Sequence, residues 1–354
     1  MANIKVAPIP VPPGATLLEY LSNWNMAQKE LALRLDISIK QINKIVKGKS
    51  PITNETALKL EKVLGVPASF WLGLESSYQE AKTRLNLSIV NEEETLIAKT
   101  INYAEIARLG WVDKTRSMQE KVENLRTYFG IVNLELIPKL IPGAFRISTS
   151  YEPSELALAT WLRKGELIAQ EISTNKYSKT KIKNLFSEIR DLTKKEPDEF
   201  LSILEEKCAE CGIALAFVPH ISKTHINGAT KWINSKRVIL QLSLRGAYAD
   251  IFWFSLFHEI GHIYLEHNKK ETLIENLDPN SLIEIEANDF ARNILIPDKD
   301  YTNFIQNIEI TKSSIITFCE NQNIHPGILV GRLMHDKLIK YNQFSELRDR
   351  YSFS

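Results

Sequence analysis

The segment 248–267 reads YADIFWFSLFHEIGHIYLEH, and it decides most of what the sequence predicts for the C-terminal part of the chain. Apolar side chains fall on nearly every side of a helix drawn through it, which predicts a buried helix. Within it lies a His-Glu-x-x-His motif, His258-Glu259-Ile260-Gly261-His262. Positions four apart stack on one helix face, so both imidazoles can reach one zinc ion. Glu259 can then act as general base in hydrolysis by metal-activated water.

A catalytic zinc site also needs a third protein ligand and an open position. The next helical pattern, 282–295, offers Glu284 and Glu286, and the spacing alone leaves both open. The alternative interpretation is a pair of core histidines with ordinary hydrogen bonds. Burial of two imidazoles and a carboxylate without partners is costly, however, and a metal satisfies all three. His267 falls on another side of the helix from His262 and is expected to be a polar helix-end residue.

The N-terminal region has the spacing of a helix-turn-helix. Helical patterns at 28–35 and 39–46 flank a break at Asp36-Ile37-Ser38, and the second helix would be the recognition helix. Lysine can read guanine in the major groove, asparagine or glutamine can pair with adenine, and a helix start can meet a phosphate. The alternative is a helical interaction module with a solvated lysine face. The side chains expected to contact DNA are Gln28, Lys40, Gln41, Asn43 and Lys44.

This N-terminal string resembles the XRE-type (Cro/phage-repressor-like) domains, and more closely the HigA-type antitoxins. The resemblance covers about residues 7–80 and is carried by Gln28–Ala32, Ile45–Lys49 and Phe70-Trp71-Leu72. Asp36 stands where relatives often have glycine in the turn, but aspartate tolerates the left-handed conformation. The resemblance implies a double-stranded DNA operator as partner. Symmetric operators usually call for a two-fold dimer, so we expect a homodimer.

The C-terminal part resembles the ImmA/IrrE-type metallopeptidases over roughly residues 210–340. The matching strings are Phe252–His262 and Glu286–Ala291, followed by Leu295 and Pro297. In that family the two motif histidines and a glutamate just before an alanine bind zinc. By this resemblance the zinc ligands are His258, His262 and Glu286, with Glu259 catalytic and Glu284 as an alternative register. Family members cleave transcription repressors, which implies a protein substrate.

Composition and charge set wider limits. The 354 residues include 44% apolar and 25% charged residues and three cysteines, which excludes a disulfide-built scaffold. No secretory signal and no apolar stretch near the ~20 residues of a membrane span are present, so we expect a cytoplasmic protein with no membrane partner. The net charge of +1 hides an asymmetry. Residues 1–85 hold 11 basic and 7 acidic residues, and the remainder holds 33 and 36.

The expected fold is mainly α with a small antiparallel sheet (α+β), formed by β-prone segments at 213–218, 226–233 and 238–242. The last of these segments precedes the motif helix and would hold substrate by strand addition. The Cys208-x-x-Cys211 pair is expected to serve packing only. The expected domains are a helix-turn-helix domain at 1–80, a helical connecting region at 81–211 and a zincin-like domain at 212–354.

These features predict a DNA-binding transcription regulator that carries a zinc-dependent metalloendopeptidase domain. It would hydrolyse a protein such as a repressor or a toxin–antitoxin partner. The alternative is a HigA-like antitoxin or transcription repressor whose zinc domain is a non-catalytic sensor or protein-interaction module.

Overall fold

The computed structural model describes residues 10–87, 89–140, 153–224, 226–243, 248–267, 272–274 and 281–351. The chain divides into two compact units, Met1–Asn91 and Glu92–Ser354, which are described separately below. In the described part of the chain, no helix combines the length and the apolar character needed to cross a membrane.

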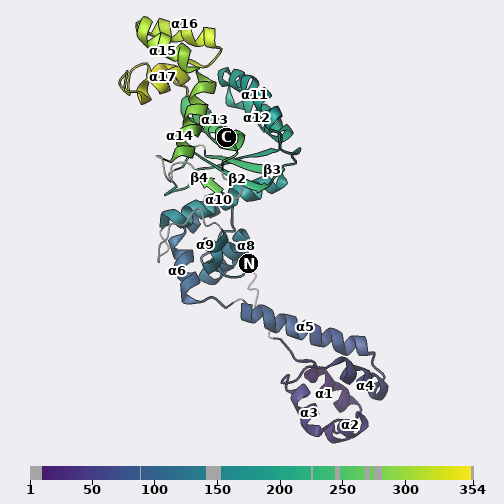
Figure 1. Cartoon of the computed structure of the whole chain (residues 1–354). Helices are drawn as coiled ribbons and strands as arrows, with labels where there is room; N and C mark the ends of the chain where they lie inside the picture. The colour runs from purple at the N-terminus through teal and green to yellow at the C-terminus, as the bar shows by residue number, and fades with distance from the viewer. Residues whose placement is uncertain are drawn as a thin grey trace. The chain divides into compact units, whose positions relative to one another are not determined.

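The first unit is a bundle of five helices (Figure 1), namely α1 (Pro13–Asn23), α2 (Gln28–Arg34), α3 (Ile39–Val46), α4 (Asn54–Leu64) and α5 (Ala68–Leu87). Its core includes Leu31, Ile42 and Trp71, all fully buried. Asp36 has φ 51°, so the turn between α2 and α3 takes the left-handed conformation that the sequence suggested. The Ser38 hydroxyl then caps α3 by accepting from the Gln41 amide at 3.1 Å.

The second unit begins with helices that the sequence suggested would only connect two domains. These are α6 (Glu92–Thr100), α7 (Tyr103–Arg108), α8 (Met118–Phe129), the 3-10 turn η1 (Leu134–Leu136), α9 (Ile137–Leu140) and α10 (Pro153–Glu171). Glu94 accepts hydrogen bonds at 2.9 Å from both the Arg126 Nε and the Leu134 amide. A buried ion pair therefore joins α6, α8 and η1.

A four-stranded sheet lies at the centre of the second unit. The strands β1 (Ile213–Val218), β2 (Gly228–Asn234), β3 (Arg237–Ser243) and β4 (Thr272–Ile274) are ordered β1-β3-β2-β4. The sheet is mixed, because β1 pairs with β3 in parallel while the other pairs are antiparallel. The expectation of a purely antiparallel sheet was therefore wrong for the pairing of β1 with β3. The suggestion that Val238–Leu242 binds substrate is also wrong, because β3 is an inner strand paired on both sides.

Helices cover both faces of the sheet (Figure 1). Ala214 and Ile239 pack on one face against Ala169 of α10. The alternate residues of β1 and β3 face a second layer, as the period of two requires. The helices of that layer are α11 (Lys179–Asp191), α12 (Pro197–Glu210) and α13 (Ala249–Leu265). Trp253, Leu256 and Phe257 of α13 are fully buried, which confirms the expected buried helix.

The remaining elements pack around α13. They are the 3-10 turn η3 (Leu192–Lys194), α14 (Leu282–Leu295), α15 (Asp298–Asn307), α16 (Lys312–Gln322), α17 (Pro326–His335) and the 3-10 turn η4 (Ser345–Leu347). The C-terminal segment holds the start of α13. Arg348 donates to both carboxylate oxygens of Asp250 at 3.1 and 2.7 Å, and the Trp253 indole donates to the Tyr351 hydroxyl at 2.8 Å.

The Cys-x-x-Cys pair lies where α12 ends, and both side chains are buried. Burial raises the pKa of the Cys208 thiol, and it raises the pKa of the Cys211 thiol to about 11. Both thiols therefore stay protonated at neutral pH, which suits a packing role.

Candidate functional site

Three ligand-type side chains meet between α13 and α14. His258 and His262, one turn apart on α13, are each 1% exposed, and their Nε2 atoms lie 3.0 Å apart. Glu284 in the first turn of α14 places one carboxylate oxygen 3.3 Å from the Nε2 of His258 and the other oxygen 3.3 Å from the Nε2 of His262. The potential ligand atoms of the three residues all lie within 4.8 Å of one another.

The spacing of these nitrogen and oxygen atoms suits a tetrahedral zinc site. Zinc–ligand bonds of about 2.0–2.1 Å place neighbouring tetrahedral ligand atoms roughly 3.3–3.4 Å apart. Here the two Nε2 atoms lie 3.0 Å apart, and each lies 3.3 Å from its own oxygen of the Glu284 carboxylate, so the three side chains are close enough to surround one ion. Two imidazoles and one carboxylate are also a donor set that zinc accepts, and three protein ligands leave a fourth position open.

The protonation states favour metal binding as well. Burial lowers the pKa of His262, which keeps its imidazole neutral, the form that binds a metal. Burial alone would raise the pKa of Glu284. Its hydrogen bonds with His258 and His262 outweigh that effect and bring the pKa to about 2, so this carboxylate stays ionised.

A second ring of side chains orients the two histidines. The Nδ1 atom of His258 lies 3.0 Å from the Asn288 Oδ1, and the Nδ1 atom of His262 lies 3.0 Å from the Nδ1 of His267. The Nε2 of His267 lies 3.0 Å from a carboxylate oxygen of Glu286. When the Nε2 atoms of His258 and His262 bind a metal through their lone pairs, the Nδ1 atoms must carry the protons and donate outward.

The third residue of the cluster differs from the one that the family resemblance suggested. The Glu286 side chain is 63% exposed and contacts His267, so Glu284 replaces it in the cluster. Residues two apart point to nearly opposite sides of a helix, and only one of the two can face α13. Glu284 shares its face with Ala287, where the helices meet closely. A Cβ atom on Gly261 would lie only 3.4 Å from the Ala287 Cα.

Glu259, the expected catalytic residue, is 1% exposed and points toward the start of β2. A Cβ atom on Gly228 would lie 2.5 Å from the Glu259 Oε1, so only glycine leaves room for this carboxylate. Gly228 was not recognised from the sequence. The nearest signal is its place at the start of a β-prone segment, where glycine often marks close approach of another group.

The expected DNA-contacting residues lie on α2 and α3. Lys40, Asn43 and Lys44 are exposed, while Ile42 and Ile45 face the core as expected. Gln28 is half-buried where α2 begins. Gln41 is also half-buried, and its amide donates to the Ser50 hydroxyl at 3.0 Å.

Comparison with known protein families identifies two domains in the chain. Residues 25–71 match the helix-turn-helix family, and residues 249–314 match the IrrE N-terminal-like domain. The second match includes α13 and α14 and therefore the whole histidine–glutamate cluster. The chain belongs to the XRE-type helix-turn-helix family and also carries an IrrE-like domain.

Similar proteins match the helix-turn-helix domain. The uncharacterized HTH-type transcriptional regulator YddM of Escherichia coli (strain K12) is 27% identical over 77 residues, which are 22% of this chain and 82% of that protein. Virulence-associated protein I of Dichelobacter nodosus is 34% identical over 83 residues, 22% of this chain and 77% of that protein.

Solved structures match the same part of the chain. The Pseudomonas aeruginosa antitoxin HigA with the higBA promoter is 29% identical, covers 22% of this chain and 86% of its own, and has a TM-score of 0.22. An addiction module antidote protein of the HigA family from Coxiella burnetii is 29% identical, covers 23% of this chain and 97% of its own, and has a TM-score of 0.20.

Proposed function

We propose that this protein is a DNA-binding transcription regulator whose IrrE-like domain is a zinc-dependent metalloendopeptidase. Its substrate would be a protein, such as a repressor or a toxin–antitoxin partner. One observation carries the proposal, namely the buried cluster of His258, His262 and Glu284, in which the two Nε2 atoms lie 3.0 Å apart and each lies 3.3 Å from a Glu284 oxygen. Glu259, which follows His258 on the same helix, is buried as well.

Zinc held by these three residues would polarise the peptide carbonyl and lower the pKa of a coordinated water. The role of Glu259 in the reaction is that of general base. Its carboxylate accepts the proton of the attacking water and passes that proton to the amine that leaves. Its carboxylate lies against Gly228 at the start of β2 and is not a member of the histidine–glutamate cluster. Asn288 and His267 fix the ring orientations of the two histidines.

The N-terminal domain would bind the operator through α3. Lys40, Asn43 and Lys44 are exposed on this short helix, and a lysine and an asparagine there can contact phosphates and base edges. The name of YddM, an HTH-type transcriptional regulator, supports the same role. A palindromic operator is bound by two copies of the DNA-binding domain, so we also propose that the protein is a homodimer. We propose the cytoplasm as its location, because the operator DNA lies there.

A single substitution tests the peptidase. The operator is first identified by sequencing the DNA that the protein retains, and the proteins encoded beside it become candidate substrates. The zinc-loaded wild type should cleave one of them, as gels and mass spectrometry report. Glu259→Gln should keep its zinc, measured by elemental analysis, and lose cleavage. Should the wild type and Glu259→Gln both bind zinc and both leave these proteins intact, a non-catalytic zinc module would be the better description.

A further inference from the structure

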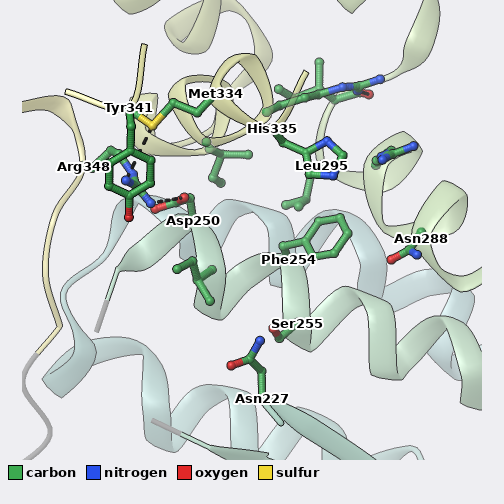
Figure 2. A pocket seen from close by; sticks show the side chains of 16 residues that line it. Asn227, Asp250, Phe254, Ser255, Asn288, Leu295, Met334, His335, Tyr341 and Arg348 are labelled. Carbon is green, nitrogen blue, oxygen red and sulfur yellow. Dashed lines mark hydrogen bonds and ion pairs between the residues drawn. The ribbon is translucent and has the colours of Figure 1, made fainter. Parts of the chain in front are cut away.

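A cavity of about 510 Å³ lies along the part of α13 that precedes the His-Glu-x-x-His motif (Figure 2). Two of its lining residues lie next to His258, and a third adjoins Gly228. Asn288 contacts His258, the ring of Phe254 lies 6.2 Å from the His258 ring, and Asn227 precedes the glycine that faces Glu259. Ile251, Phe254 and Ser255 lie seven, four and three residues before His258, so the cavity follows the same helix face as the motif.

The inner walls are mainly apolar. Ile251 and Phe254 come from α13, Leu295 and Ile296 from the end of α14, and Ile328 from α17. Figure 2 shows Phe254 and Leu295 side by side in the middle of the cavity. Its volume lies within the roughly 300–1,000 Å³ typical of ligand pockets.

The charged groups of the far wall are already paired. Arg348 is held by Asp250 through two hydrogen bonds of 3.1 and 2.7 Å (Figure 2). Arg332 donates to the Ile296 carbonyl at 2.7 Å and to Asp298 at 2.6 Å. A guest therefore meets guanidinium groups whose charge is compensated, and burial of apolar surface becomes the main source of affinity.

We propose that this cavity is the specificity pocket of the IrrE-like domain and takes a large apolar side chain, such as leucine, phenylalanine or methionine, next to the scissile bond. This inference rests on the proposed peptidase function. Asn227, Ser255 and Asn288 supply polar groups in the cavity lining, and Asn288 contacts His258, so the substrate backbone would pass along this side. The apolar walls farther along receive the side chain.

Binding of small hydroxamates to the zinc-loaded full-length protein tests the pocket without any need for turnover. The probes are the hydroxamates of N-acetylglycine, N-acetylleucine, N-acetylphenylalanine and N-acetylaspartate, with dissociation constants measured by calorimetry. The glycine probe reports the metal alone. Burial of a leucine or phenylalanine side chain should tighten binding about tenfold to a hundredfold relative to glycine. The aspartate probe should gain nothing.

Filled-pocket variants locate the effect. Ile251→Trp, and independently Met334→Trp from the opposite wall, should remove the gain from leucine while zinc content and glycine-probe binding stay unchanged. Ile308→Trp, at an exposed position outside the cavity, is the matched control and should keep the gain. The use of two filling variants guards against one that fails to fold.

The outcomes separate the two proposals. Zinc and glycine-probe binding without a leucine gain in the wild type would overturn the pocket and leave the metal site standing. A gain that survives both filling variants would also overturn it. Absence of bound zinc and of glycine-probe binding would overturn the proposed function, and the pocket with it.

Discussion

The Nδ1 atoms of His262 and His267 lie 3.0 Å apart, although His267 comes after the end of the helix that carries His262. Only one of the two nitrogens can carry the shared proton. When the Nε2 of His262 binds a metal, its Nδ1 must be the donor, and His267 accepts. His267 must then hold its own proton on Nε2, from which it donates to Glu286 at 3.0 Å. The Glu286 carboxylate thus fixes the tautomer of His267, and His267 in turn fixes that of His262.

We expect His267→Ala to weaken zinc binding about 10–100-fold, the usual cost of losing a partner of a metal-binding histidine. Without His267, His262 loses the acceptor that holds its ring and tautomer in place. His267→Gln should restore part of the affinity, since its amide oxygen can accept from Nδ1. Competition with a chelator of known affinity measures each variant.

His335→Ala is the control for this change. His335 is an exposed histidine of the same unit that contacts only Asp336 among the interactions described for it, so zinc affinity should not change. Wild-type zinc affinity in His267→Ala would contradict a positioning role for His267.

Substitutions of the two glutamates of α14 should have clearly different effects on zinc affinity. Glu284→Ala removes a carboxylate that lies 3.3 Å from both cluster nitrogens, and it should cost more affinity than any loss outside the cluster. Glu286→Ala removes only the group behind His267 and should cost no more than about tenfold. Equal losses in the two variants, or a larger loss from Glu286→Ala, would contradict the assignment of Glu284.

The sequence predicted the cluster histidines because their spacing is local, but not the exact third residue. Glu284 and Glu286 are both plausible by spacing. The decisive signal is the helix face shared by positions 284, 287, 288 and 291, where small or polar residues meet α13. His267 was assigned to another side of the helix because a regular 100° step was assumed. The helix ends at Leu265, and Glu266 at φ 61° returns the chain toward His262.

Long-range relationships were beyond the reach of periodicity. The inner position of β3 depends on its parallel pairing with β1. β2 lies between these two strands in the sequence but not in the sheet, and no local pattern encodes such a pairing. The approach of Gly228 to Glu259 joins residues from different elements. The cavity needs α17 and the C-terminal segment against α13, and their packing is tertiary. The helix-turn-helix was recognised more fully because its core, cap and turn all lie within residues 17–71.

Gly228→Ala should imitate Glu259→Gln without replacing a charged residue. The added methyl would lie 2.5 Å from Oε1 and 2.6 Å from Cγ of Glu259, so the carboxylate must move. We expect zinc content to persist, cleavage to fall sharply, and stability to drop by about 1–3 kcal/mol from overpacking. Elemental analysis, the cleavage assay and urea unfolding measure the three quantities.

Gly73→Ala gives the matched control, since a Cβ atom there meets nothing within 4 Å and the residue lies inside α5. This substitution should leave cleavage unchanged and stabilise its helix by up to about 1 kcal/mol. Full cleavage by Gly228→Ala would show that Glu259 does not need its present position.

Zinc removal should destabilise the IrrE-like domain alone. A metal that binds the native state and not the unfolded chain stabilises by mass action, about 2.7 kcal/mol at a free concentration one hundred times the Kd. Thermal unfolding with and without a chelator should therefore shift one transition, assigned to the second unit by hydrogen exchange of α13 and α14. A chelator-induced shift of the first unit, or none in either, would contradict this expectation.

The DNA half yields a prediction that depends on salt. Lys40 and Lys44 are exposed on α3, and each phosphate contact adds about one to the slope of log affinity against log salt. The double variant Lys40→Ala/Lys44→Ala should weaken operator binding and flatten that slope by about two for each bound protomer, as fluorescence anisotropy at several salt concentrations reports. Lys62→Ala, at an exposed position on α4, should leave the slope unchanged and controls for net charge. An unaltered slope in the double variant would contradict a place for α3 in the proposed interface. Loss of lysines that contact phosphates must reduce the number of counterions released on binding, and that reduction flattens the slope.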